Sequence, residues 1–259
     1  ENRDGNALLI TGEVNVALNN LFNSAKAFEL HWRNYLQRSQ RLETEFSWPY
    51  LFGSKIGLNG QFELNKYDTL FLNLSTRIGF RYQQQGNNYI QFYYQFDGSN
   101  LITADTSAVR SSRRLPSNNP YRVDNYGISA VQRQLDFGPN PRKGISLTSN
   151  VAIGVKQLLR NSQIDQVTFY SESRNANISI YDTIQRRSLR ARIELGADWF
   201  IPLFKKASLL NKLNFNALFA DEILFNEYYN FGGFSDLQGF DERSIFASKY
   251  LHYRLEYRY

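Results

Sequence analysis

The chain has 259 residues, no cysteine, a formal net charge of +6 and 15% aromatic residues. Its length suits one domain, and the lack of cysteine excludes a disulfide framework. A membrane-spanning helix needs about 20 consecutive apolar residues, and the longest apolar runs, such as residues 199–204, are far shorter. Spanning helices are therefore excluded, and a negative mean hydropathy combined with many aromatic residues indicates half-buried strands.

The basic charge does not predict nucleic-acid binding, because Lys and Arg are spread along the chain among 24 acidic residues. The chain opens on the polar residues 1–6, shows no signal peptide and contains no Met. We therefore expect that an N-terminal part of the protein, with periplasmic domains, is absent from this chain.

Alternation of apolar and polar residues is the main structural signal. In residues 10–19, Ile10, Gly12, Val14 and Val16 fall on one face, and mostly polar residues fall on the other. Successive side chains of a strand point to opposite faces, so this pattern predicts a strand. The same pattern predicts strands at residues 28–33, 42–48, 56–65, 70–83, 90–96, 145–155, 189–199, 213–219 and 251–259.

The lengths of the connections complete the predicted order. Outer-membrane barrels have short turns at one end and long loops at the other. To keep the long connections at one end, we expect a weak strand at residues 101–108, followed by a strand at 123–135. Residues 167–181 are interpreted as a hairpin within a loop rather than as two further strands. The total is twelve strands.

Strand length and aromatic placement favour a transmembrane antiparallel β-barrel of a bacterial outer membrane over a soluble sandwich. Ten or more alternating residues exceed the usual length of a globular strand, and aromatic residues gather where strands meet loops, as at residues 48–52. The apolar face would contact outer-membrane lipid, and the polar face would line the lumen. The charged residues expected in the lumen are Arg190, Arg192, Glu194, Asp198, Arg254, Glu256 and Arg258. We expect them to pair across strands, with ion selectivity or docking of a loop as alternatives.

Residues 231–243 form the most informative segment. It contains Gly232, Gly233, Leu237, Gln238, Gly239, Phe240 and Arg243. Three glycines within eight residues allow the backbone to fold tightly. The segment is interpreted either as a loop tucked into the lumen with Phe240 packed, or as a flexible surface loop.

This segment resembles the sixth-loop signature of the BamA/TamA superfamily of outer-membrane assembly and translocation barrels. The signature is Gly-Gly, three or four residues, then a hydrophobic residue, Arg, Gly and an aromatic residue. Residues 48–53 and 139–144 look like further family features. The chain departs from the signature at Gln238, where the family has Arg. That Arg is expected to anchor the loop to acidic lumen groups, so we expect anchoring here to be weaker or to be supplied by Arg243.

The resemblance implies sixteen strands, with this loop after the eleventh. Residues 1–259 would then be one truncated barrel domain of about twelve strands, lacking the last four. The alternative is that residues 251–259 form an ordinary terminal strand of a smaller barrel.

The resemblance also implies a function, namely insertion of other barrel proteins or export of polypeptides. Its expected partners are client outer-membrane or secreted polypeptides and accessory lipoproteins or periplasmic factors, without cofactor, metal or nucleic acid. Clients would pair at a lateral seam formed by the first strand, at Ile10, Gly12, Val14 and Val16. A passive porin and a structural scaffold are the alternatives. An enzyme is not expected, because His31 and His252 are far apart and no catalytic grouping stands out.

Overall fold

The computed structural model describes residues 11–36, 38–86, 88–104, 106–172, 174–204, 206–233, 237, 239–241 and 243–259. Eleven strands form one sheet in which every neighbour pairs antiparallel. In sheet order they are β1 (Gly12–Leu21), β2 (Lys26–Leu36), β3 (Ser39–Trp48), β4 (Ile56–Tyr67), β5 (Phe71–Gln83), β6 (Tyr89–Leu101), β7 (Tyr121–Leu135), β8 (Gly144–Leu158), β11 (Arg187–Pro202), β12 (Ser208–Ala220) and β15 (Lys249–Arg258).

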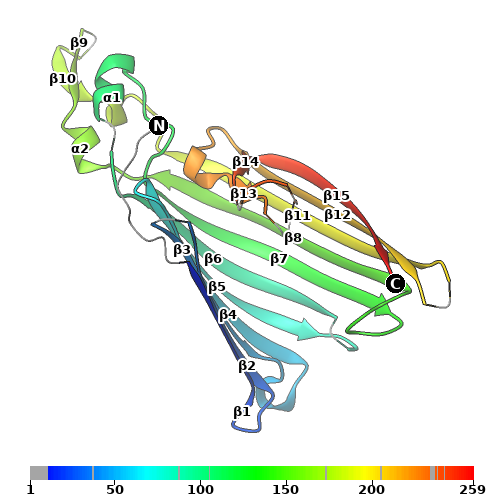
Figure 1. Cartoon of the computed structure of the whole chain (residues 1–259). Coiled ribbons are helices and arrows are strands. Elements are labelled where there is room, and N and C mark those ends of the chain that lie inside the picture. Colours follow the sequence, from blue (N-terminus) through cyan, green and yellow to red (C-terminus); the bar gives the residue numbers. More distant parts are fainter. Residues whose placement is uncertain are drawn as a thin grey trace.

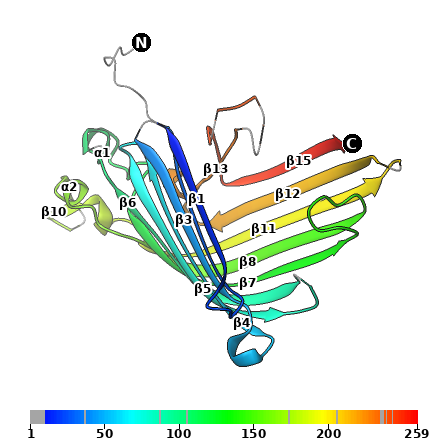
Figure 2. The same ribbon diagram turned by 60° about the horizontal axis from the view of Figure 1, so that its bottom comes forward.

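The sheet curves into an open trough (Figures 1 and 2). The strands β1 to β6 form one wall, and β8, β11, β12 and β15 form the other. The two edge strands, β1 and β15, do not pair with each other in the described part of the chain. The predicted all-β antiparallel fold is therefore confirmed, as an eleven-stranded sheet that is not closed.

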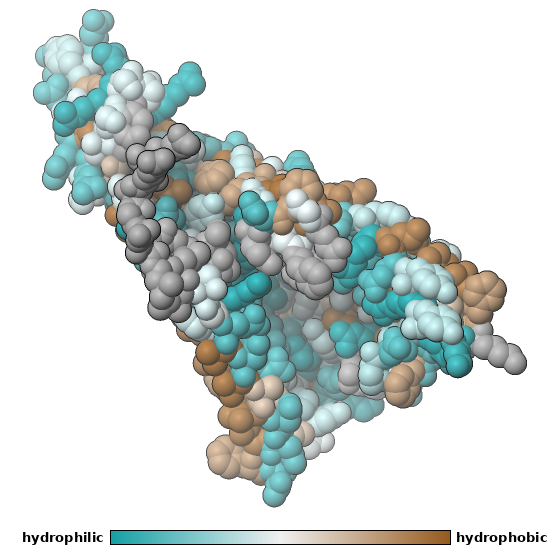
Figure 3. All heavy atoms as spheres, viewed as in Figure 1, coloured by the Kyte–Doolittle hydropathy of each residue, from teal (hydrophilic) through white to brown (hydrophobic). Residues whose placement is uncertain are grey.

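The two faces of the sheet differ sharply in polarity. Outward side chains include many large apolar residues, and Leu189 and Leu251 are each 66% exposed. Inward side chains include buried polar and charged residues such as Asp97, Lys156 and Arg190. In Figure 3 hydrophilic residues line the hollow between the walls, and hydrophobic residues lie along its rims. The alternation in the sequence thus appears as an apolar convex face and a polar concave face.

The weak strand expected at residues 101–108 is not present, and that prediction was wrong. β6 continues to Leu101, which pairs with Phe71, and the helix α1 (Thr106–Ser112) follows. Val109 of this helix is fully buried in a cluster with Ile164 and Tyr181. Because these apolar residues serve a core between loops, their spacing did not mark a strand. The long connection after β12 therefore follows the tenth strand of the sheet, not the eleventh.

Residues 102–120 and 159–186 pack together into a small dome at one end of the sheet (Figure 1). Besides α1, the dome contains α2 (Ser162–Asp165), β9 (Thr168–Ser171), β10 (Ala176–Ser179) and a 3-10 turn, η2 (Ile180–Asp182). β9 and β10 pair only with each other, so the predicted hairpin is confirmed. The dome has its own apolar core, which also includes Val167.

The opposite end of the sheet carries short turns with exposed aromatic tips. Phe22, between β1 and β2, is 90% exposed, and Phe52 in the 3-10 turn η1 (Leu51–Gly53) is 94% exposed. None of the helices in the described residues has the length and apolar character that crossing a membrane requires.

Candidate functional site: the concave face and its inserted loop

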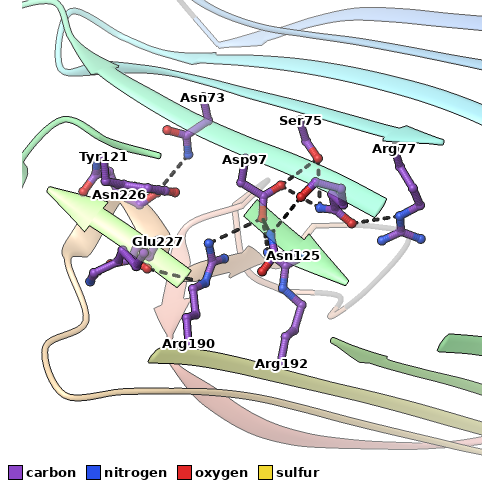
Figure 4. Close-up of polar contacts among 12 residues, drawn as sticks. Asn73, Ser75, Arg77, Asp97, Tyr121, Asn125, Arg190, Arg192, Asn226 and Glu227 are labelled. Atoms are coloured by element: carbon purple, nitrogen blue, oxygen red, sulfur yellow. Dashed lines mark hydrogen bonds and ion pairs between the residues drawn. The ribbon is translucent and has the colours of Figure 1, made fainter. Parts of the chain in front are cut away.

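Asp97, on β6, is the centre of a polar network on the concave face (Figure 4). Its carboxylate oxygens accept hydrogen bonds from Gln95 Nε2 at 2.6 Å, Ser75 Oγ at 2.8 Å, Arg192 Nη2 at 2.9 Å, Asn125 Nδ2 at 3.0 Å and Arg190 Nη1 at 3.4 Å. These donors come from β5, β6, β7 and β11. These donors compensate for the loss of hydration that a buried carboxylate suffers. Asp97 therefore connects four strands at the floor of the trough.

The connection between β12 and β15, residues 221–248, folds into this network and is called the inserted loop. Glu227, in the 3-10 turn η3 (Phe225–Glu227), accepts a hydrogen bond from Lys156 Nζ at 2.5 Å. The Lys156 and Glu227 side chains are 1% and 0% exposed, and Arg190 Nε lies 3.6 Å from Glu227 Oε2. An acidic loop residue is thus buried between two basic residues of the strands.

Asn226 joins the inserted loop to three other segments. Its Nδ2 donates to Ser99 Oγ at 2.7 Å and to the backbone oxygen of Asn119 at 3.0 Å. Its own backbone oxygen accepts from Asn73 Nδ2 at 2.8 Å. Because Ser99 and Asn73 belong to the wall and Asn119 borders the dome, one asparagine connects all three parts.

The rest of the loop base is held by a tyrosine and by aromatic packing. Tyr229 OH donates to Glu194 Oε1 at 3.2 Å. Two short strands, β13 (Tyr229–Phe231) and β14 (Ile245–Ala247), pair with each other within the loop. Phe231 stacks on Tyr250 at a centroid distance of 4.3 Å, and the Phe225 and Phe246 rings lie 4.6 Å apart. The loop therefore packs against the wall and is not a free surface segment.

The three glycines of the motif lie farther along the loop and all have positive φ values. Gly232, Gly233 and Gly239 have φ values of 120°, 97° and 92°, which favour glycine. A Cβ added at Gly232 would lie 2.8 Å from the backbone oxygen of Asp241. Leu237 forms an isolated bridge with Gly233, and Arg243 lines the concave cavity.

Two expectations about this motif have different outcomes. Phe240 is 53% exposed, so the alternative in which this side chain packs is not the arrangement observed. The aromatic packing of the loop lies at its base instead, where Phe231 stacks on Tyr250. Gln238 lies outside the described residues, and the expected transfer of anchoring to Arg243 stays a prediction.

The charged residues predicted for the lumen fall into separate groups. Arg190, Arg192 and Glu194 come together around Asp97 and the inserted loop. Asp198 lies 3.8 Å from Lys212 of β12. Arg254, Glu256 and Arg258 interact along β15 itself, at 3.7 and 2.9 Å. Only the first group belongs to the site.

The first strand forms one edge of the sheet. Gly12, Val14 and Val16 lie on β1, which pairs only with β2 among the described strands, and Val14 and Val16 are exposed. Ile10 lies outside the described residues. The arrangement leaves backbone groups of β1 available along its outer edge.

A cavity of about 730 Å³ remains on the concave face beside the inserted loop. Glutamates of β2, β3 and β4 line one side of it, and Arg190, Arg192 and loop residues line another. No group of three or more His, Asp or Glu residues within the described chain is placed to hold a metal ion.

Four residues of the site were not predicted from the sequence, namely Asp97, Lys156, Asn226 and Glu227. Lys156 had a readable signal, because it alternates with the outward residues Val151, Ile153 and Val155 and so faces inward. Asn226 and Glu227 lie in a loop without alternation, and nothing in the local sequence marks them.

Comparison with known proteins supports the fold. No family model matches the chain, and no curated protein matches it. Among solved structures, the chain is similar to BamA from Haemophilus ducreyi, in a crystal structure lacking POTRA domains 1-3, with a TM-score of 0.52 and 15% sequence identity. The match covers 90% of this chain and 43% of that chain, so this chain spans less than half of that structure's length. The likeness shows a BamA-like barrel fold.

Proposed function

We propose that this chain is part of an outer-membrane barrel of the BamA/TamA type, which inserts other barrel proteins or exports polypeptides. The observation that carries the proposal is the inserted loop, which bears the glycine motif and is anchored in the polar concave face by Glu227. A loop held there occupies space that a simple solute channel would leave open.

The membrane location is supported by the apolar convex face. Outward side chains such as Phe92, Ile153 and Leu251 are largely exposed in the isolated chain. A contiguous apolar face of this extent is costly in water and suits lipid. The polar concave face would then face a water-filled interior.

The client would be recognised at the edge of the sheet. Unpaired backbone groups of an edge strand can accept an added strand by β-augmentation. In the described chain, the outer edge of β1 offers such groups. A client strand that pairs there would extend the sheet, with one face toward the lipid and the other toward the concave side.

A cysteine cross-link tests whether a client strand pairs with the edge of β1. Residues 1–259 contain no cysteine. In the full-length protein, with any cysteine outside these residues replaced by serine, Val14→Cys provides a single thiol on β1, and Ile153→Cys provides a matched outward control on β8, which is paired on both sides. We expect a disulfide between Val14→Cys and a cysteine in a client's terminal strand, and none with Ile153→Cys. No Val14→Cys adduct in an assembly-active protein would contradict the proposal.

A passive channel is the second candidate, because the concave cavity is open and polar. Conductance of the full-length protein in a planar bilayer separates the two. A plugged translocation barrel gives a small, flickering conductance, whereas a porin gives a large and steady one. A large steady conductance would favour the channel.

A further inference from the structure

Two arginines stand at the dome end of the apolar convex face. Arg122 on β7 lies opposite Gln157 on β8, and Gln157 lies opposite Arg187 on β11. Directly opposite residues of antiparallel strands share a face, so the three side chains form one outward row. The two arginines are two strand spacings apart, which is about 10 Å.

The face next to this row is mainly apolar. Leu189, Tyr126 and Ile153 point outward there and are largely exposed, and the Tyr94 and Tyr126 rings lie 5.5 Å apart. Asp124, on the same outward face of β7 as Arg122, accepts a hydrogen bond from Tyr94 OH at 2.5 Å. The border between polar and apolar surface therefore lies directly beside the arginines.

Neither arginine has a hydrogen-bond or ion-pair partner for its guanidinium among the described residues, and both are exposed. In contrast, Arg190, Arg192 and Arg160 each contact a carboxylate. An unpaired cation beside an apolar surface is complementary to an amphiphile that carries an anionic group. Guanidinium groups bind phosphate oxygens in pairs of parallel hydrogen bonds.

We propose that Arg122, Gln157 and Arg187 bind the phosphate of a lipid headgroup, with its acyl chains lying on Ile153, Leu189 and Tyr126. The site rests on the proposed membrane location. Its occupant is a phospholipid of net negative charge in the leaflet that meets the dome end. Each arginine near a membrane surface contributes on the order of fivefold to the attraction of an anionic lipid.

Spin-labelled lipids test the site in the full-length protein reconstituted in phosphatidylcholine vesicles. The fraction of immobilised label is measured for phosphatidic acid and for phosphatidylcholine. We expect the wild-type protein to prefer phosphatidic acid, and R122Q/R187Q to lower that preference by roughly fivefold or more. The control, R110Q/R114Q, removes the same charge from exposed arginines of residues 102–120 in the dome and should keep the preference.

Two results for the variants would overturn the site alone. They are an unchanged preference in R122Q/R187Q, and an equal loss in both double variants, which would assign the effect to the summed charge of the dome end. An inserted wild-type protein that immobilises both lipids equally would do the same. A protein that immobilises neither lipid would not be inserted, and that result would overturn the membrane proposal as well.

Discussion

The inserted loop is held by an acidic side chain between basic side chains of the strands. Glu227 contacts Lys156 on β8 and lies beside Arg190 on β11. The resemblance to known barrels implied the opposite polarity, a loop arginine against acidic lumen groups. This chain has Gln238 where the family has Arg. Its loop still makes a charged contact, which Glu227 supplies near the start of the loop.

Replacing Glu227 by Gln should release the loop. The change leaves Lys156 buried without an anionic partner and leaves Arg190 with Asp97 alone, and removing one member of a buried ion pair costs about 3–5 kcal/mol. We expect proteolytic cleavage within residues 221–248 to accelerate and bilayer conductance to increase. Glu222→Gln is the matched control, because it removes the same charge from the same loop at an exposed position. Equal cleavage in the two variants would refute the anchoring role.

Replacing Asp97 by Asn should weaken the floor of the trough. Arg190 and Arg192 would lose the carboxylate that they share, which is expected to cost about 3–5 kcal/mol of the free energy of unfolding. Asp198→Asn is the control, because Asp198 is about one third exposed and lies 3.8 Å from Lys212, and partly exposed pairs contribute little. Urea unfolding in detergent measures both. A loss for Asp97→Asn no larger than that for Asp198→Asn would contradict the network's role.

At the residue scale, the sequence could predict which face of a strand a side chain lies on, but not which side chains it contacts. The parity of β11 placed Arg190, Arg192 and Glu194 on the polar face. Asp97 and Arg190 are separated by 93 positions, and the curvature that brings their strands into contact is not visible in a local pattern. The contacts of Glu227 with Lys156 and Arg190 likewise form only when the strands and the inserted loop are assembled.

At the scale of elements, the dome shows where periodicity misleads. Residues 101–108 carry apolar residues because two loops form a core around Val109 and Tyr181. An apolar position in a loop core and one in a short strand look alike in sequence. The hairpin at residues 168–179 was predictable, because both of its strands alternate and pair locally.

The dome should depend on the charge of Asp182. Arg160 and the Ser179 N–H lower the pKa of the Asp182 carboxyl below its ordinary value of 3.8. A lowered pKa means that the contact stabilises the dome above pH 3.8 and is lost as the pH falls through the lowered pKa. Asp182→Asn should therefore raise amide hydrogen exchange around residues 176–182 at neutral pH.

Glu172→Gln is the control for this variant, because Glu172 is exposed on the same hairpin. Its exchange at neutral pH should match the wild type. If Asp182→Asn exchanged no faster than Glu172→Gln, the Arg160 contact would not hold the dome.

At the scale of the whole molecule, the chain reverses the usual placement of polar and apolar residues. Its concave face buries charge, and its convex face exposes apolar side chains. Alternation along the strands was sufficient to predict this reversal and the antiparallel sheet. The open edge between β1 and β15 and the number of strands in the main sheet, eleven, depend on the curvature of the sheet and on the dome. Local alternation predicts neither of them.

A charge on the convex face should be costly only in the middle of the apolar band. Ile153→Lys is expected to reduce the free energy of folding into lipid vesicles by about 2–4 kcal/mol, whereas Gln157→Lys, at the dome end of the same strand and face, should cost about 0–1 kcal/mol. Urea-driven folding in vesicles compares the two. Equal costs would argue against a lipid-facing convex surface.

Asn119 connects the dome to the inserted loop through hydrogen bonds. Its side-chain oxygen accepts a hydrogen bond from Tyr181 OH of the dome at 2.7 Å, and its backbone oxygen accepts one from Asn226 of the inserted loop at 3.0 Å. Two hydrogen bonds at a single residue therefore link the dome to the inserted loop. A displacement of the dome would be expected to shift the loop as well, without any ligand entering the trough.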